Sequence, residues 1–304
     1  MITLDCWNGF HCIAEACRHS CCKGWEIDID EDTLRKYATV GGELGRELRR
    51  SIRIDEDGAA FATVGKEERC PFLNERGLCR LILELGEDYL SEICTEHPRF
   101  YHRVNGMEEQ GFGLCCEESA NLVLSAKTPL HLNGRWFWRE NAVKTAQNRR
   151  LSLERRLRLL SSLPNRNWKA LFFSLERMDE AWTAVLARWD GALLPVEQTM
   201  AVPLENLLVY FLFRHWTEED DDRALPLAVL SVRVIASLHA EGCGSLRELS
   251  RLYSAEIEPP LFRKVYSTPR QQRCRRRGKG RRGCPFAVSS ADSAALRRLR
   301  CPQR

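Results

Sequence analysis

Cysteine side chains are concentrated in the first 116 residues, which hold ten of the 14 cysteines in the chain. Four of them, Cys12, Cys17, Cys21 and Cys22, follow one another with the spacing C-x4-C-x3-C-C. Thiolate is a soft ligand that binds zinc ions and iron–sulfur clusters. We therefore predict that this part of the chain binds a metal ion or cluster. Redox-active or structural thiols and disulfides are the alternatives.

The spacing between the cysteines narrows the kind of metal site. No C-x-x-C pair occurs in the sequence, which argues against a zinc ribbon built from two such pairs. The C-x3-C-x2-C pattern of radical enzymes that use S-adenosylmethionine also fails, since Gly24 stands where its third cysteine would be. If Cys17 and Cys21 lie on one helical turn, they face the same way and Cys22 points elsewhere. Two separate sites, or one site plus structural thiols, both remain open.

The composition is that of a protein that can form a sizeable core. Its 304 residues suggest one large domain or two of ordinary size, and 44% of them are apolar. No apolar run reaches the length of ~18 residues that a membrane-spanning helix needs. The first residues include Asp5 and lack the basic-then-apolar run of a secretory signal. A reducing cytoplasm is therefore the expected compartment.

The cysteine-rich part is expected to combine short strands with helices. Residues 26–30 alternate acidic and apolar side chains, which predicts a short strand before a helix capped by Asp30 or Asp32. The dipeptide Asn105-Gly106 predicts the tight turn of a hairpin. Further helices are predicted near 41–52, 81–90 and 116–126, a hairpin strand within 54–66, and a turn-rich loop over 70–79.

The second half of the chain has helical periodicity. Apolar residues recur at intervals of three and four from Trp168 to Trp189, and this stripe is predicted to be core. Ser245 and Glu248 form a capping box that opens a last helix. Four or five helices with short connections imply a bundle. The predicted fold class is mainly α, with an irregular Cys-rich region with short strands over 1–130 and a helical domain over 131–258.

The composition changes after Glu258. Residues 259–304 hold 14 Lys and Arg against one acid, Asp292, whereas residues 1–258 are acidic overall. Such a segment cannot bury a core, so we expect a disordered tail. Runs of Arg, Gly, Pro and Cys are typical of a shifted reading frame in a GC-rich gene, which would make this end non-native. A basic arm for nucleic acid or an acidic surface and a metal-binding extension are the other interpretations.

Several motifs resemble those of the flagellin lysine-N-methylases of bacteria. They read F-H-C-I-A-E-A-C-R-H-S-C-C-K-G-W-E-I-D-I-D at 10–30, C-P-F-L-N-E-R-G-L-C-R at 70–80, L-S-E-I-C-T-E-H-P-R at 90–99 and L-C-C-E-E at 114–118. The cysteine motifs are also distantly similar to small cysteine-rich proteins described as zinc- or iron-chelating. The chain departs from the family's Leu-x-Cys-Pro-Glu pattern at Glu117, which replaces the proline.

The resemblance implies a protein-lysine N-methyltransferase that carries a [4Fe–4S] cluster and transfers methyl groups from S-adenosylmethionine to flagellin. Trp25 and Arg99 are the candidate cofactor-binding residues. Trp25 stacks on a ligand or belongs to the core, and Arg99 binds the carboxylate of the methyl donor or forms a structural ion pair. No catalytic base is identified. The candidate metal ligands are Cys12, Cys17, Cys21, Cys22, Cys70, Cys79, Cys94 and Cys116, whereas Cys6, Cys115 and Cys243 are expected to be dispensable.

Two other function classes remain. A non-catalytic iron- or zinc-binding protein would use the cysteines but would not need the large helical part. A nucleic-acid binder would use the basic tail, although the acidic body disfavours it. The acidic side chains of Glu26, Asp28 and Asp30 either receive a basic substrate or form an ordinary solvated face.

Overall fold

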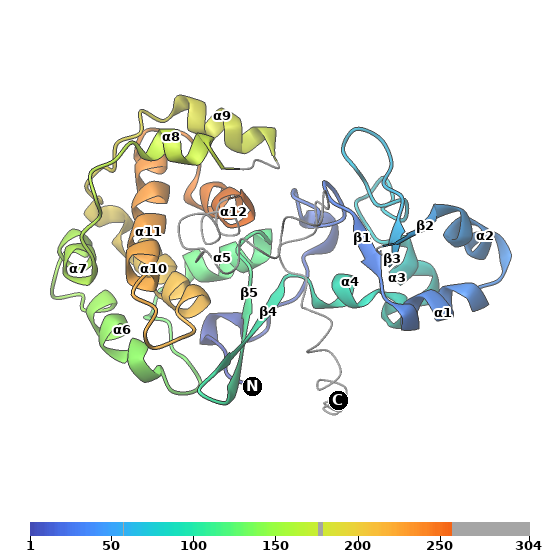
Figure 1. Ribbon diagram of the computed structural model, residues 1–304, viewed down its shortest axis with the longest axis horizontal. Helices are drawn as coiled ribbons and strands as arrows, with labels where there is room; N and C mark the ends of the chain where they lie inside the picture. Colours follow the sequence, from blue (N-terminus) through green and yellow to red (C-terminus); the bar gives the residue numbers. More distant parts are fainter. Residues whose placement is uncertain (57, 176–178, 257–304) are drawn as a thin grey trace. The chain divides into compact units, whose positions relative to one another are not determined.

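The computed structural model describes residues 1–56, 58–175 and 179–256, so the predicted tail over 259–304 lies outside the described residues. The described chain forms two compact units, a larger one of residues 1–21 and 98–256 and a smaller one of residues 22–97. Helices α1–α12 and two small sheets make up these units, which confirms the mainly α fold class (Figure 1). The units differ from the predicted segments 1–130 and 131–258, because the first residues and the hairpin after Pro98 belong with the helices.

The larger unit contains the hairpin that the turn signal predicts. Strands β4 (Arg99–Val104) and β5 (Met107–Phe112) are antiparallel. Asn105 and Gly106 join them with φ of +48° and +78°, the left-handed conformation that a tight hairpin turn requires. Ile2 bridges to Glu109 and so ties the N-terminus to this hairpin.

Helices α5–α12 form the rest of the larger unit. The long helices α10 and α11 lie side by side, with α5 and α12 against them (Figure 1). Most side chains of α10 and α11 are buried. The helices are α5 (Glu117–Ser125), α6 (Glu140–Ala146), α7 (Leu153–Leu160), α8 (Trp168–Phe173), α9 (Glu180–Arg188), α10 (Ala201–His215), α11 (Ala224–Ala240) and α12 (Leu246–Glu256), with 3₁₀ turns at Asp5–Trp7, Ala14–Ala16, Phe137–Arg139 and Gln198–Met200.

The predicted aromatic stripe is core, as expected, but it is divided between two helices. Trp168 and Phe172 of α8 and Trp182 of α9 are buried, as is Trp189 beyond the end of α9. The Phe172 and Trp189 rings stack with their centroids 5.9 Å apart. Half of the predicted capping box is observed, since Glu248 N–H donates to the Ser245 hydroxyl at 3.3 Å, while the Glu248 carboxylate accepts from Arg251 Nη2 at 2.8 Å. None of the described helices is long and apolar enough to cross a membrane.

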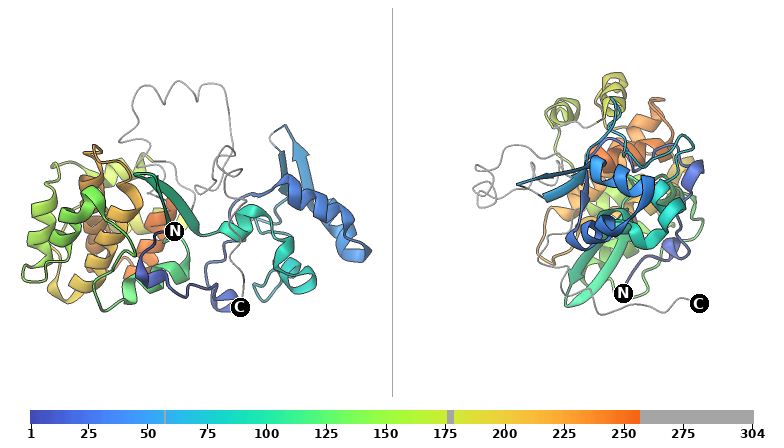
Figure 2. Two further views of the ribbon diagram at one scale, coloured as in Figure 1. Left: turned by 90° about the horizontal axis from the view of Figure 1, so that it is seen from below. Right: turned by 90° about the vertical axis from the view of Figure 1, so that its right-hand side faces the viewer.

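The smaller unit, drawn in blue to cyan in Figure 2, is built on a three-stranded antiparallel sheet. The strand order is β1-β3-β2. Its core gathers Ile27, Tyr37, Leu48, Phe61 and Phe72. The elements are β1 (Ile27–Ile29), α1 (Glu31–Thr39), α2 (Gly42–Ser51), β2 (Ile52–Asp55), β3 (Gly58–Phe61), α3 (Arg80–Leu85), a 3₁₀ turn at Glu87–Tyr89 and α4 (Glu92–Glu96).

Asp30 and Gly86 fix two helix ends in the smaller unit. The Asp30 side chain caps α1 by accepting from Thr33 N–H at 2.9 Å, as predicted. The helix predicted over 81–90 is wrong in length, because α3 ends at Leu85. Gly86 has φ +92° and interrupts the helical hydrogen bonding there. The chain therefore turns before it enters α4, which carries Cys94.

Candidate metal centre

Four of the predicted ligand cysteines gather in the core of the smaller unit. Cys70 is buried, and Cys22, Cys79 and Cys94 are partly buried against the same apolar cluster. They come from four separate places: the loop before β1, the loop after β3, the N-cap of α3, and α4. Segments distant in the sequence therefore bring their thiols to one apolar region.

Local hydrogen bonds position these cysteines. Cys70 N–H donates to the Cys22 carbonyl at 2.8 Å. In the loop that follows, the Asn74 side chain accepts from Leu78 N–H at 2.9 Å, and Arg80 N–H donates to the Phe72 carbonyl at 2.8 Å. This side-chain-stabilised turn returns the chain so that Cys79 enters α3 beside the segment that carries Cys70.

Burial keeps the thiols of this four-thiol group protonated unless a cation compensates their charge. Burial raises the pKa of Cys70 and Cys94 to about 12 and also raises the pKa of Cys79. Cys70 interacts electrostatically with Cys22, Cys79 and Cys94, which raises its pKa further. Backbone N–H groups lower the pKa of Cys70 and Cys79, because they donate hydrogen bonds to the two sulfurs. A soft cation in place of the thiol protons would compensate four such thiolates, so the donor set fits zinc or a [4Fe–4S] cluster.

Tyr37 lies close to the four thiols, although nothing in the sequence pattern indicated that it belongs near them. Burial raises its pKa well above the usual value, and Cys94, Cys79 and Cys70 raise it further. Its hydroxyl donates to the Tyr89 carbonyl at 2.8 Å. Tyr37 therefore stays a neutral, anchored phenol on the border of the four thiols.

A second group of thiols lies in the larger unit. Cys116, at the N-cap of α5, interacts electrostatically with Cys17 and Cys12. Burial raises the pKa of Cys116 to about 11, although hydrogen bonds from the backbone N–H groups of Ser119 and Glu118 lower it. We refer to Cys12, Cys17 and Cys116 as the three-thiol group.

Glu117, the residue that replaces the family's proline, connects the three-thiol group to charged neighbours. The Cys17 thiol donates to Glu117 Oε2 at 3.9 Å. Arg18 donates to the same carboxylate from its backbone N–H at 2.9 Å and from Nη2 at 2.9 Å. A structural role for Glu117 was not predicted, although its place directly after Cys116 could have suggested one.

The eight predicted ligands are divided equally between the two units. Cys22, Cys70, Cys79 and Cys94 belong to the smaller unit, and the three-thiol group belongs to the larger one together with the exposed Cys21. The condition that Cys17 and Cys21 lie on one helical turn is not met, since residues 17–22 are not helical, so that argument decides nothing about Cys22. Among the described residues no three Cys, His, Asp or Glu side chains stand in the geometry of a metal site. The ligand assignments remain predictions.

The two candidate cofactor-binding residues lie in different units. Trp25 is partly buried against the core of the smaller unit. The Arg99 guanidinium in the larger unit lies over the Phe112 ring, 5.4 Å from its centroid. Their cofactor roles remain predictions.

The acidic residues near Trp25 are largely structural. Glu26 pairs with Arg53, and Asp30 caps α1 and also accepts from Glu92 N–H at 2.8 Å. Asp28, at the middle of β1, is exposed. The interpretation of all three as a receiving face for a basic substrate is thereby weakened.

Comparison with known proteins supports the resemblance seen in the motifs. The chain is 30% identical over 121 residues to the lysine-N-methylases of Salmonella typhimurium and Salmonella choleraesuis, a match that covers 38% of this chain and 30% of each relative. It is 29% identical over 121 residues to the flagellar biosynthetic protein FliU of Salmonella muenchen, which covers 72% of that protein. No family model and no solved structure matches. The predicted resemblance to flagellin lysine-N-methylases is confirmed by these relatives.

Proposed function

We propose that this protein is a protein-lysine N-methyltransferase that transfers methyl groups from S-adenosylmethionine to lysine side chains of flagellin. The observation that carries the proposal is the sequence match to proteins named lysine-N-methylase. The cysteine motifs of this chain, which resemble those of such enzymes, support it. The match covers 30% of the length of these relatives, so the activity, methyl donor and acceptor are inferred for this chain.

We further propose that the four-thiol group holds the iron–sulfur cluster. Four thiolates are the usual ligand set of a [4Fe–4S] cluster, and this group supplies four that share one apolar region. Backbone N–H groups aimed at the sulfurs of Cys70 and Cys79 suit it, because such hydrogen bonds stabilise ligating thiolates. When bound, the cluster would cross-link the four segments that carry these cysteines.

The proposed reaction is a direct substitution at carbon. The lysine ε-nitrogen must first lose a proton, since a free lysine has a pKa of about 10.4. Desolvation or a neighbouring base lowers that pKa. The neutral amine then attacks the sulfonium methyl in line; the new N–C bond forms as the S–C bond breaks, and S-adenosylhomocysteine leaves. Positioning of amine and methyl supplies much of the rate enhancement.

A metal-binding protein without catalysis is the alternative. Its support is the four-thiol group itself, which would suit storage or delivery of iron or zinc. The larger unit favours the enzyme over this alternative, because a protein that only carries metal would not need the extensive core around α10 and α11.

Two measurements on anaerobically purified full-length protein test the proposal. Iron, acid-labile sulfide and zinc analysis should find an iron–sulfur cluster, whereas stoichiometric zinc without sulfide would contradict the cluster. Incubation with S-adenosylmethionine and flagellin should add methyl-group masses to lysine-containing peptides. A cluster-loaded protein that transfers no methyl group would favour the carrier.

A further inference from the structure

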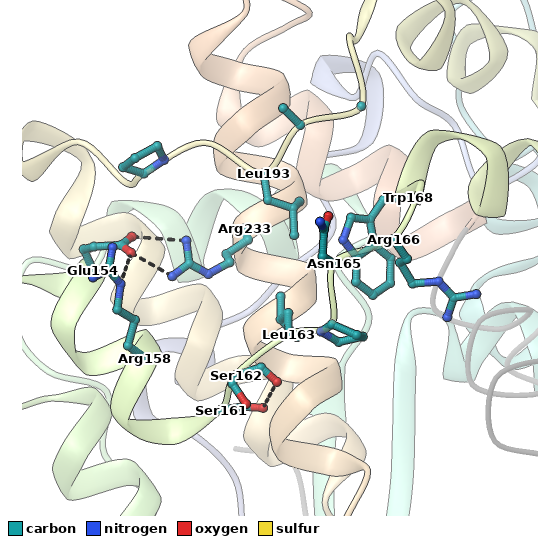
Figure 3. Close-up of a pocket in the computed structure, with 14 residues that line it drawn as sticks. Glu154, Arg158, Ser161, Ser162, Leu163, Asn165, Arg166, Trp168, Leu193 and Arg233 are labelled. Atoms are coloured by element: carbon teal, nitrogen blue, oxygen red, sulfur yellow. Dashed lines mark hydrogen bonds and ion pairs between the residues drawn. The ribbon is translucent and has the colours of Figure 1, made fainter.

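A cavity of about 660 Å³ opens in the larger unit, and none of the predicted site residues lines it. It lies among the end of α7, the connection to α8, the segment 191–195 and Arg233 of α11 (Figure 3). Glu154, Arg158 and Arg233 stand on one side and Asn165, Arg166 and Trp168 on the other, with Leu163 and Leu193 between them. Its volume is within the range of small-molecule sites.

The single carboxylate in the lining has no capacity left for a ligand. Glu154 accepts from both terminal nitrogens of Arg233, at 2.9 and 3.1 Å, and from Nε of Arg158 at 2.8 Å. Val196 N–H supplies a fourth hydrogen bond at 3.3 Å. A carboxylate has about four acceptor positions, and these are filled. Glu154 therefore organises the arginines and cannot receive a cationic ligand.

Hydrogen-bond donors around the cavity remain available. Arg158 uses only Nε, and Arg166 makes no hydrogen bond or ion pair among the described residues, lying over the Trp168 ring at 5.3 Å. In the described structure no backbone carbonyl accepts from the N–H groups of Ser162 and Asn165. Two backbone N–H donors of the chain between α7 and α8 thus lack an acceptor within the described structure.

Charge and shape together define the ligand class. Three arginines and one glutamate line the cavity, which leaves two net positive charges. Leu163 and Leu193 are partly buried and offer an apolar surface between the charged sides. S-adenosylmethionine, whose sulfonium and ammonium outweigh its carboxylate, is disfavoured by a positive cavity. The methyl donor of the proposed reaction therefore needs another place to bind.

We propose that this cavity binds an anionic small molecule that carries a phosphate or carboxylate group and an apolar part. The anion binds the free nitrogens of Arg158 or Arg166, because guanidinium groups hold both kinds of anion through paired hydrogen bonds. The apolar part lies against Leu163 and Leu193. This inference does not depend on the proposed methyltransferase activity.

Calorimetric titration of the full-length protein tests the inference. The probes are phenyl phosphate and benzoate, which separate phosphate from carboxylate recognition, and benzyl alcohol as a neutral analogue. At least one anion should bind and benzyl alcohol should not. Arg158→Ala or Arg166→Ala should weaken that binding about tenfold or more, the effect of losing a charge-assisted hydrogen bond.

Arg155→Ala is the matched control, since Arg155 is an exposed arginine on the same helix α7 that does not line the cavity. It should leave the affinity unchanged, and all three variants should unfold at the temperature of the parent. The inference is overturned if neither anion binds, if benzyl alcohol binds as well as the anions, or if Arg155→Ala weakens binding as much as the other variants do.

Discussion

The backbone N–H of Cys70 donates a 2.8 Å hydrogen bond to the carbonyl oxygen of Cys22. This bond joins the second cysteine motif to the last cysteine of the first motif, and it does so within the smaller unit. The neighbouring Cys21 belongs to the other unit. The adjacent pair Cys21-Cys22 is therefore where the chain passes from one group of thiols to the other.

The first prediction separates the two groups by their metal content. Cys70→Ser combined with Cys94→Ser should remove most of the iron, because a cluster cannot be held by two remaining thiolates of its set. Cys12→Ser combined with Cys17→Ser should leave the iron content unchanged. Iron and sulfide analysis after anaerobic purification measures both. Loss of a similar share of iron in the two double variants would contradict a single cluster in the four-thiol group.

Local features of the fold followed from the sequence because they depend on neighbouring residues. The Asn105-Gly106 turn, the Asp30 cap and the Ser245 cap all act within a few residues. The length of the helix predicted over 81–90 was wrong for a local reason too. The apolar pattern continues past Gly86, whereas the φ of +92° at Gly86 ends the helix.

The division of the cysteines could not be predicted from spacing. Cys22 and Cys94 are far apart in the sequence, and they reach one core because α4 packs against β1. The Glu117–Arg18 contact is equally non-local. The cavity beside Arg158 was missed because its lining combines three separate segments without a motif.

A second prediction concerns Glu117 as the first residue of α5. Proline is favoured at this helical position, whose N–H has no partner within the helix. Glu117→Pro should therefore preserve α5 but lose the contacts to Arg18, at a cost of about 1 kcal/mol in the free energy of unfolding. Glu117→Gln should cost a similar amount, because it keeps the shape and loses the charge. Urea denaturation measures both, with Glu118→Gln as the control. A much larger loss in the proline variant alone would show that the helix itself is disturbed.

The third prediction is that the free energy of unfolding depends on pH because of His102. Burial, with Arg214 and His215 nearby, lowers the pKa of His102 to about 3. A lowered folded-state pKa means that the unfolded chain takes up the proton first, so stability falls as the pH drops below the unfolded value of about 6.5 and levels off near the folded value. Between about pH 7 and about pH 5 the free energy of unfolding should fall by about 2 kcal/mol from this residue.

The variant His102→Asn checks this prediction, because asparagine keeps a hydrogen-bond donor and does not titrate. Its unfolding free energy should depend less on pH than that of the parent. His131→Asn, at an exposed histidine of the same unit, is the matched control and should keep the pH dependence of the parent. If the unfolding free energies of the parent and of His102→Asn change equally with pH, His102 is not the cause.

The last prediction concerns a buried ion pair in the larger unit. Glu109 and Arg139 are both fully buried, and Arg139 Nη1 donates to Glu109 Oε2 at 3.1 Å. The Arg139 guanidinium also lies over the Trp136 and Phe213 rings. Glu109→Gln leaves this cation without its counter-charge, and loss of one partner from a buried pair costs about 3–5 kcal/mol. Denaturant unfolding should show this loss, whereas Glu108→Gln at the exposed neighbouring position should change stability by less than about 0.5 kcal/mol.

The double variant Glu109→Leu with Arg139→Met decides whether the charge or the packing is responsible. Replacement of both partners by apolar residues removes the uncompensated charge, and such replacements are often neutral or stabilising. The double variant should therefore be more stable than Glu109→Gln and close to the parent. If it is as unstable as the single variant, the cost lies in the lost shape and hydrogen bonds around Trp136 and not in the unpaired arginine.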